Sequence, residues 1–560
     1  MTQRLANRRV RLLLAIFTLA FGIMLARAVW LQAVRAHALG TRATSQHREV
    51  VFVPAGRGTI VDRTGVQLAI GEEVTTVYAN PRHVVRPRAV ALAAGKVLGL
   101  DPGTLYPLLA DRSRGFVYLQ RKADPARAAE LRRRGFEGVG FYPEERRTYP
   151  QRTVAAQVLG FAGLDNKGLA GLELGLDRTL AGRPGRQTVV KDALGRVIDV
   201  RGIQAERPGR DVVLTLDHTV QANAEAVLRA TVRRWHARSA TAVVLDPRTG
   251  GVLAMAVAPG FDANRYPATP SALHRNRAVT DTFEPGSTYK VVTVGAALTE
   301  KLVSPSTTYT LPDSIQVADR VVHDAEERET ETMSVAQILS RSSNVGAVTL
   351  AQLLGKERLA RWVARFGFGR ETGVDFPGES AGIVLPPDRW SGSTIGNVPI
   401  GQGIAVTPIQ LAAAYATIAN RGVWTRPHLV ERTAGLPRRR PERRRVLPGV
   451  VAAQLNTMLR LVVTEGTGTL AAVPGYTVAG KTGTAAKPEP EGGYSESRYV
   501  ASFVGFVPAT KPRLVILVTV DEPRGTIWGG VVAAPAFAEI ARFDLQYLEV
   551  QPDSPSAPAE

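Results

Sequence analysis

The sequence predicts an α+β chain, anchored in a membrane, in which a strand-rich first domain precedes a second domain of antiparallel strands flanked by helices. Three observations support this prediction. A chain of 560 residues is long enough for more than one domain. An apolar stretch follows a group of arginines near the N-terminus. Further on, two apolar runs at 240–245 and 252–257 flank a strong turn signal and predict a β-hairpin.

The apolar stretch predicts a retained membrane anchor at residues 12–34. Residues 12–26 carry no charge, and continuing past Arg27 to residue 34 gives the roughly twenty residues that a span needs. Arg27 can extend to the membrane surface, a level that also suits Trp30. A cleaved signal peptide is the alternative, but no small-x-small cleavage site follows the apolar run. The arginines within residues 1–11 predict a basic cytoplasmic tail, with the bulk of the chain outside.

The first domain is predicted over residues 45–208, which are rich in strand patterns and turns. Gly58 and Gly65 enclose a short strand, across which Arg57 and Asp62 are expected to pair. Other polar and glycine-rich segments of this domain suit turns and scaffold ion pairs. No segment here pairs a nucleophile with a base, so the domain is expected to be folded and non-catalytic.

The second domain is predicted over residues 209–548, beginning at a Pro-Gly turn. Its strands are expected at 212–217, 240–245, 252–257, 481–485, 500–506 and 514–520, and helices at 219–234 and 533–547. A glycine turn at 401–403 feeds an alanine-rich helix, which is expected to pack in the interior. The proline- and serine-rich end of the chain predicts a disordered tail at 549–560.

The strongest chemical signal is the stretch around Ser287. Pro285 and Gly286 interrupt the preceding structure, and the residues from Ser287 onward suit a helix. Ser287 therefore sits at a helix N-terminus, where unpaired N–H groups favour developing negative charge. Lys290 lies one turn away on the same face, and a lysine in a dry pocket can lose its proton and activate a serine. Taken alone, the same spacing also fits a capping serine and a surface lysine.

Two further motifs favour a catalytic role for Ser287 and Lys290 over helix capping. Ser342-Ser343-Asn344 follows downstream, and Lys481-Thr482-Gly483-Thr484 comes later. Ser-x-x-Lys, Ser-x-Asn and Lys-Thr-Gly, in this order, are typical of serine β-lactamases and penicillin-binding proteins.

On these motifs the chain resembles a class B penicillin-binding protein, a D,D-transpeptidase of peptidoglycan, and is most similar to the cell-division (FtsI-type) branch. The resemblance covers nearly the whole chain. It implies a serine β-lactamase-like transpeptidase domain at 209–548 that stands on a non-catalytic, dimerisation-type pedestal at 45–208.

The resemblance also implies a role for each motif residue. Ser287 is the nucleophile, Lys290 the base, and Ser342 the relay of a proton to the leaving amine. Asn344 holds the substrate's amide carbonyl, and Lys481 sets a positive potential. The residues that bind the terminal carboxylate are Thr482, Gly483 and Thr484. Backbone N–H groups of Ser287 and Thr484 form the oxyanion hole.

The implied substrate is the D-Ala-D-Ala end of a peptidoglycan stem peptide, and β-lactam antibiotics are implied ligands. The acyl group passes to an amine on a neighbouring strand. No cofactor and no metal are expected. Implied partners are a polytopic glycosyltransferase of the divisome and other division proteins, with a single-pass anchor in the cell membrane and an extracytoplasmic catalytic domain.

The net charge of +20 raises nucleic acid as a partner, but no nucleic-acid motif is present and the charge is spread along the chain. An anionic membrane surface or anionic wall polymer suits it better. The arginine-rich stretch 437–445 is expected to be a solvated loop, with contact to such an anion as the alternative.

Three other functions remain as alternatives: an elongation-specific transpeptidase, a β-lactamase or penicillin sensor, and an inactive scaffold. A β-lactamase of class A needs a carboxylate that activates water, and no Glu-x-x-Leu-Asn-like segment lies between Asn344 and Lys481. The intact motifs argue against a scaffold.

Overall fold

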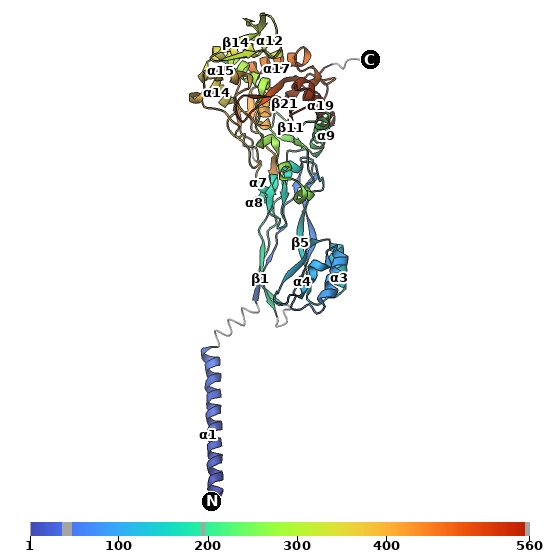
Figure 1. The fold of residues 1–560 in the computed structure, drawn as a ribbon, viewed down its shortest axis with the longest axis vertical. Coiled ribbons are helices and arrows are strands. Elements are labelled where there is room, and N and C mark those ends of the chain that lie inside the picture. Colours follow the sequence, from blue (N-terminus) through green and yellow to red (C-terminus); the bar gives the residue numbers. More distant parts are fainter. Residues whose placement is uncertain (1, 36–47, 192–196, 439, 555–560) are drawn as a thin grey trace. The chain divides into compact units, whose positions relative to one another are not determined.

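The computed structural model describes residues 2–35, 48–191, 197–438 and 440–554. The chain forms two compact units (Figure 1). One comprises Met1–Gly56 with Gly182–Pro208, and the other comprises Arg57–Ala181 with Gly209–Glu560. These units group most of the expected first domain with the second, so the domain boundaries drawn from the sequence stay predictions.

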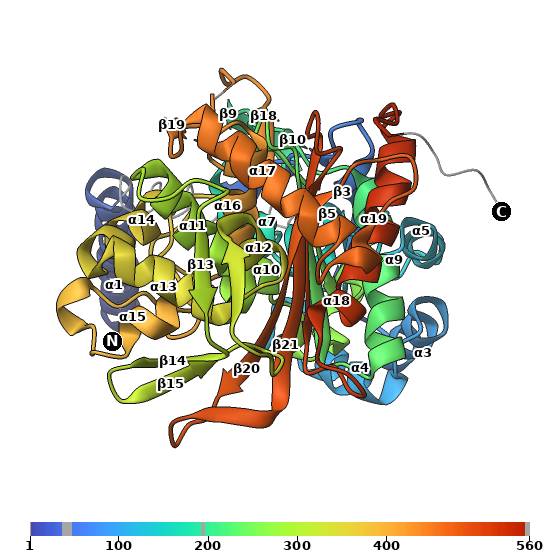
Figure 2. The same ribbon diagram turned by 90° about the horizontal axis from the view of Figure 1, so that it is seen from above.

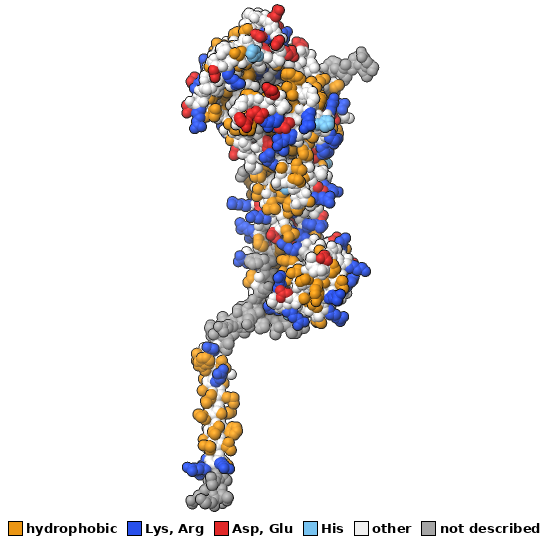
Figure 3. Space-filling view, in the orientation of Figure 1, with side chains coloured by type: hydrophobic (Ala, Val, Ile, Leu, Met, Phe, Trp, Pro, Cys, Tyr) orange, Lys and Arg blue, Asp and Glu red, His pale blue; other side chains and the backbone are white. Residues whose placement is uncertain are grey.

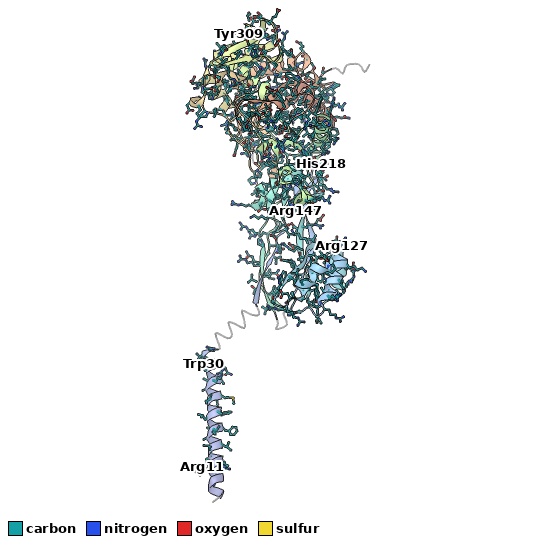
Figure 4. The ribbon with its side chains drawn as sticks, viewed as in Figure 1. Arg11, Trp30, Arg127, Arg147, His218 and Tyr309 are labelled. Atoms are coloured by element: carbon teal, nitrogen blue, oxygen red, sulfur yellow. The ribbon has the colours of Figure 1, made fainter. Side chains whose placement is uncertain are left out.

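The first unit contains the expected anchor and a small sheet. Helix α1 (Thr2–Val29) continues into the π-helix η1 (Trp30–Val34). An 18-residue window within Asn7–Val34 has a mean hydropathy of 2.3 and contains no buried residue, so this helix is long and apolar enough to cross a membrane. Hydrophobic side chains line its length (Figure 3), and Arg11 and Trp30 lie toward its opposite ends (Figure 4).

The sheet of this unit is antiparallel, in the order β1-β8-β9. Its strands are β1 (Arg48–Val53), β8 (Gly185–Lys191) and β9 (Val197–Gln204).

The second unit begins with a sheet that joins the two expected domains. β10 (Val212–Leu214) pairs in parallel with β2 (Ile60–Val61) and antiparallel with β18 (Val430–Thr433). This shared sheet explains why 57–181 groups with the later part of the chain. The sheet continues through β3 (Gln67–Ala79), which pairs with both β4 (Val117–Ala123) and β5 (Val139–Thr148). Helices α3 (Pro87–Leu98), α4 (Pro102–Ala110) and α5 (Pro125–Arg133) belong to the same region.

The ion pair expected between Arg57 and Asp62 is wrong. Arg57 Nε instead donates to the buried carboxylate of Glu173 at 2.6 Å, and Arg57 Nη1 donates to Asp177 at 2.7 Å. Arg147 Nε donates to the other Glu173 oxygen at 2.6 Å. Two guanidinium groups thus share one fully buried carboxylate, which confirms a scaffold role for these residues.

The central sheet of the later part of the chain has the order β12-β11-β22-β21-β20, and every neighbouring pair is antiparallel. The expected hairpin is confirmed as β11 (Ser239–Leu245) and β12 (Val252–Ala258). The expected C-terminal strands are confirmed and longer than expected. They are β20 (Ala479–Pro488), β21 (Tyr494–Val507) and β22 (Leu514–Asp521).

Helices cover both faces of this sheet (Figure 2). On one face, α9 (His218–Trp235) and α19 (Ala534–Tyr547) share a hydrophobic core with the sheet. The other face meets α11 (Lys290–Thr299), α16 (Pro408–Ala419) and α17 (Gly449–Thr464). Every residue of α16 is buried, as its alanine-rich sequence predicts.

Shorter elements complete the described chain. They are α6 (Ala156–Leu159), β6 (Phe161–Ala162), β7 (Gly168–Ala170), α7 (Gly171–Gly175), α8 (Asp177–Leu180), η2 (Ala263–Ala268), η3 (Ser271–Leu273), α10 (Arg277–Thr280), η4 (Gly286–Tyr289), β13 (Thr308–Leu311), β14 (Ser314–Val317), β15 (Arg320–His323), β16 (Glu331–Ser334), α12 (Val335–Ser340), α13 (Asn344–Leu354), α14 (Lys356–Phe366), η5 (Pro387–Arg389), α15 (Thr394–Asn397), η6 (Val398–Ile400), β17 (Val423–Thr425), β19 (Arg443–Arg445), η7 (Thr469–Ala471) and α18 (Gly529–Val532).

Two local expectations need correction. Part of the arginine-rich stretch forms β19, which pairs with β17, and the guanidinium of Arg444 stacks over the Trp424 ring at 4.5 Å. The predicted start of the disordered tail at residue 549 is too early. Asp553 is still ordered against the domain, where it accepts a hydrogen bond from the Thr477 backbone N–H at 2.7 Å. Arg439 and residues 555–560 lie outside the described residues.

Candidate active site

Ser287 lies in the 3₁₀ helix η4, directly before α11, and is partly exposed. Gly286 precedes it with φ +54°, a left-handed conformation that favours glycine. The backbone of Gly401 approaches so closely that a side chain there would lie 2.2 Å from the Gly286 carbonyl oxygen. Tyr415, on α16, donates from its hydroxyl to the Thr288 carbonyl at 2.8 Å. The expected interior helix therefore supports the turn that carries Ser287.

Lys290 is the first residue of α11 and is fully buried. Its Nζ donates to Asn344 Oδ1 at 2.7 Å and to Ser342 Oγ at 3.2 Å, and it also contacts the Ser342 carbonyl oxygen. Folding thus brings together the first two motifs, which lie more than fifty positions apart in the sequence. Among the described residues, Lys290 makes no hydrogen bond with the Ser287 hydroxyl, a contact that often tightens only when substrate is bound.

Burial lowers the pKa of Lys290 to about 7, against the opposing influence of the Asp324 carboxylate. An exposed lysine is almost wholly protonated at neutral pH. Lys290 instead titrates close to neutrality, so a large fraction of this amine is free to accept a proton.

The Ser342-Ser343-Asn344 turn is held from two sides. Ser342 has φ +66°, an uncommon conformation for a residue with a side chain. Ser343 caps α13, because its Oγ accepts from the Gly346 N–H at 3.0 Å. Asn344 Nδ2 donates to the His323 carbonyl at 2.8 Å, which turns the amide oxygen toward Lys290.

The third motif lies on β20. Lys481 is fully buried, and its Nζ donates to Thr482 Oγ1 at 3.3 Å. Thr484 Oγ1 accepts from the Gly529 N–H at 3.1 Å, so its proton remains available to another acceptor. A side chain at Gly483 would lie 2.9 Å from the Pro285 carbonyl oxygen, so only glycine lets β20 lie this close to the Ser287 turn.

Burial, together with repulsion from Lys290, lowers the pKa of Lys481 well below its usual value. This direction opposes the positive potential expected of Lys481. A substrate carboxylate placed beside Lys481 would favour the charged amine again.

Two carboxylates near the motifs are not among the site residues that the sequence predicts. Asp324 contacts the Ser342-Ser343-Asn344 turn. Glu284 accepts at Oε1 from the Gly403 N–H at 2.9 Å and from the Tyr494 hydroxyl at 3.1 Å, and burial raises its pKa. Neither belongs to a motif, although Glu284 stands three residues before Ser287.

One cluster in the described part of the chain has donor atoms close enough to hold a metal: Asp62, Asp217 and His218. Asp62 already accepts from His218 Nδ1 at 2.7 Å and from the Thr64 N–H at 2.8 Å. Asp217 caps α9. These protein hydrogen bonds account for the cluster as part of the scaffold.

Comparison with known protein families agrees with this geometry. Residues 240–542 match the family model described as the penicillin binding protein transpeptidase domain. Residues 52–214 match the model described as the penicillin-binding protein dimerisation domain.

Relatives that match over most of their length come from several bacteria. The chain is 32% identical to the probable peptidoglycan D,D-transpeptidase PenA of Neisseria gonorrhoeae, covering 98% of this chain and 94% of PenA. It is 33% identical to the peptidoglycan D,D-transpeptidase FtsI of Escherichia coli, with 98% and 93% covered. It is 34% identical to the stage V sporulation protein D of Bacillus subtilis, with 98% and 88% covered.

Solved structures give the same result. A crystal structure of penicillin binding protein 3 from Mycobacterium tuberculosis, complexed with aztreonam, has a TM-score of 0.71 and 33% identity, covering 91% of this chain and 99% of that one. A peptidoglycan synthetase from Bifidobacterium adolescentis has a TM-score of 0.75 and 30% identity, with 91% and 99% covered. The motifs, the two matched domains and the full-length relatives together show that the chain belongs to the class B penicillin-binding proteins, the peptidoglycan D,D-transpeptidases.

Proposed function

We propose that the chain cross-links peptidoglycan through an acyl-enzyme on Ser287. The observation that carries this proposal is the buried Lys290 amine, which titrates near neutrality and lies within hydrogen-bond distance of Ser342 and Asn344. An amine of this kind can accept the Ser287 proton, as nucleophilic catalysis by serine requires.

In the first half of the reaction, Ser287 Oγ attacks the carbonyl carbon between the two terminal D-alanines and gives its proton to Lys290. A Ser287 ester forms, the peptide bond breaks, and the leaving D-alanine amine takes a proton through the Ser342 hydroxyl. In the second half, an amine of a neighbouring stem peptide attacks this ester, a new amide forms, and Ser287 regains its proton. Asn344 orients the substrate amide, and the N–H groups of Ser287 and Thr484 stabilise the oxyanion.

The substrate's terminal carboxylate is proposed to bind along β20. Thr484 offers a hydroxyl proton, Thr482 a second hydroxyl, and Lys481 the charge. Gly483 keeps this strand close to Ser287. The same residues would hold the carboxylate of a penicillin, which is proposed to acylate Ser287 covalently. Related structures of penicillin binding protein 3 from M. tuberculosis are complexes with aztreonam and with ampicillin.

The proposed setting is septal wall synthesis at the cell membrane, and the similarity to FtsI of E. coli supports it. α1 would anchor the chain once, with the N-terminus in the cytoplasm and the catalytic domain outside. The proposed partners are a polytopic glycosyltransferase of the divisome and other division proteins. An elongation-specific transpeptidase is the alternative setting.

The test is covalent labelling of the full-length chain with a fluorescent penicillin. Wild type should carry the label on the peptide that contains Ser287, and Ser287→Ala should carry none. Slow release of the label distinguishes a transpeptidase from a β-lactamase, which would release it rapidly. A wild-type chain that takes no label would refute the acyl-enzyme. Imaging of a tagged copy tests the setting, because a septal enzyme must gather at the division site.

A further inference from the structure

Asp324 is a largely buried carboxylate outside the three motifs, with its side chain 8% exposed. Its Oδ1 accepts hydrogen bonds from the backbone N–H groups of Asn344 and of Val345, the latter at 3.1 Å. The Ser343 hydroxyl donates to the same carboxylate, with its Oγ 3.1 and 3.0 Å from the two oxygens. Arg328 Nε donates to Oδ2 at 2.8 Å. One carboxylate thus contacts two residues of the second motif and the residue that follows.

Part of this arrangement is helix capping. The N–H groups of Asn344 and Val345 lie in the first turn of α13 and have no acceptor within the helix. Ser343 already accepts from the Gly346 N–H. Asp324 therefore supplies acceptors for the remaining donors, at the end of the helix where negative charge is favoured.

The contacts also extend to the reacting lysine. His323, the residue before Asp324, accepts from Asn344 Nδ2 at 2.8 Å, and Asn344 Oδ1 in turn lies 2.7 Å from Lys290 Nζ. Ser342, held in its left-handed conformation beside this anchored segment, presents its hydroxyl and carbonyl oxygens to the same Nζ. The segment 323–324 thus contacts Asn344 directly, and it also contacts Ser343, the residue next to Ser342.

Arg328 holds the carboxylate in its turn. Its Nη1 donates to the Leu311 carbonyl and its Nη2 to the Pro312 carbonyl, at 2.9 and 2.7 Å. The guanidinium thus ties Asp324 to the end of β13, so that the carboxylate is fixed on both sides.

We propose that Asp324 is a positioning residue for acylation, which holds Ser342 and Asn344 against Lys290. It acts through these residues and does not touch the substrate. The inference rests on the proposed function, in which Lys290 is the base. Among the described residues, the charges that act on Lys290 are the Asp324 carboxylate, which favours the protonated amine, and Lys481, which repels it.

The experiment compares Asp324→Ala, Asp324→Asn and a control, Ser334→Ala, in the full-length chain in detergent. Ser334 caps α12, the preceding helix, by accepting from the Gln337 N–H at 3.2 Å, so the control removes a helix cap without touching Asp324 or Lys290. The acylation rate constant for a fluorescent penicillin is measured from pH 5 to 9, together with the melting temperature.

Asp324→Ala should slow acylation by about a hundredfold, the size expected when reacting groups are displaced by about 1 Å. Asp324→Asn keeps an acceptor for the N–H groups and should be slowed less. Because it lacks the charge that favours protonated Lys290, its rate should begin to fall at a lower pH than in wild type. Ser334→Ala should lower the melting temperature and leave both the rate and its pH dependence unchanged.

The outcomes separate this inference from the proposed function. A wild-type chain that takes no label on Ser287 refutes the proposed function itself. If wild type is labelled and both Asp324 variants acylate with the wild-type rate and pH dependence, the role of Asp324 is refuted and the proposed function stands. Equal slowing by Ser334→Ala overturns it as well, because any lost helix cap would then suffice. If Asp324→Ala does not fold, Asp324→Asn decides: unchanged rate and pH dependence reject the inference.

Discussion

Acylation should depend on pH through Lys290, because burial lowers the pKa of this amine to about 7. The base must be neutral to accept the Ser287 proton, so the rate should follow its neutral fraction. That fraction is about half at pH 7, about a tenth at pH 6 and about a hundredth at pH 5, since each pH unit changes the ratio tenfold. For an exposed lysine the neutral fraction at pH 7 would be smaller by a factor on the order of a thousand.

The assay is the second-order rate constant for acylation by a fluorescent penicillin, measured from pH 5 to 9 with the full-length chain in detergent. The rate should reach a plateau above about pH 8 and fall tenfold per unit below about pH 6. Lys290→Arg should lose acylation throughout, because a guanidinium keeps its proton. Lys301→Arg, an exposed position just beyond the same helix, is the matched control and should behave as wild type.

A rate that stays constant between pH 5.5 and 8 would refute this reasoning. So would a Lys290→Arg variant that acylates at the wild-type rate with the same pH dependence, because the base would then be another group.

Three further predictions follow from the carboxylate site, the scaffold and the anchor. The double change Thr482→Ala and Thr484→Ala should raise the activation free energy of acylation by a free-acid substrate by roughly 1.5–3 kcal/mol for each lost hydrogen bond to the carboxylate. Acylation by the ester of the same substrate should change little. If rate assays show equal slowing for the acid and the ester, these threonines do not bind the carboxylate. Glu173→Ala should destabilise the fold by roughly 3–5 kcal/mol, because the buried Arg147 guanidinium loses the carboxylate it pairs with and Arg57 keeps only Asp177; an unchanged melting temperature would argue against this. Deleting residues 1–36 should yield a soluble chain that still takes the penicillin label, and a folded but unlabelled product would reject the separation of anchor and catalysis.

Local pattern predicted most elements of the transpeptidase part. The turn residues between the strands at 240–245 and 252–257 specify a hairpin because their backbone preferences act over a few residues. The alanine-rich run after Thr407 predicts an interior helix, and the structure confirms it, because α16 is buried and supports the Ser287 turn. The early start assigned to the tail was wrong, because composition alone does not reveal that Asp553 hydrogen-bonds to Thr477.

Ion pairing was predicted poorly, and Arg57 shows why. Asp62 lies five residues away and looked like a partner, whereas the actual partner, Glu173, lies 116 positions along the chain. The tertiary fold decides which carboxylate lies beside a buried guanidinium, because the two groups come from distant segments. Each buried charge needs such a partner, since leaving it unpaired would cost its full desolvation free energy.

By itself, the sequence determined the apolar N-terminal segment, the order and identity of the three motifs, and through them the family. These depend on residue type and spacing along the chain. Only the tertiary structure decided that Lys290 Nζ meets Ser342 and Asn344, that burial brings its pKa near neutrality, and that Asp324 holds the turn between them. The physical reason is that the pKa and the hydrogen bonds of a side chain depend on the groups around it in space. Many of these groups come from distant parts of the chain and lie close together only after folding.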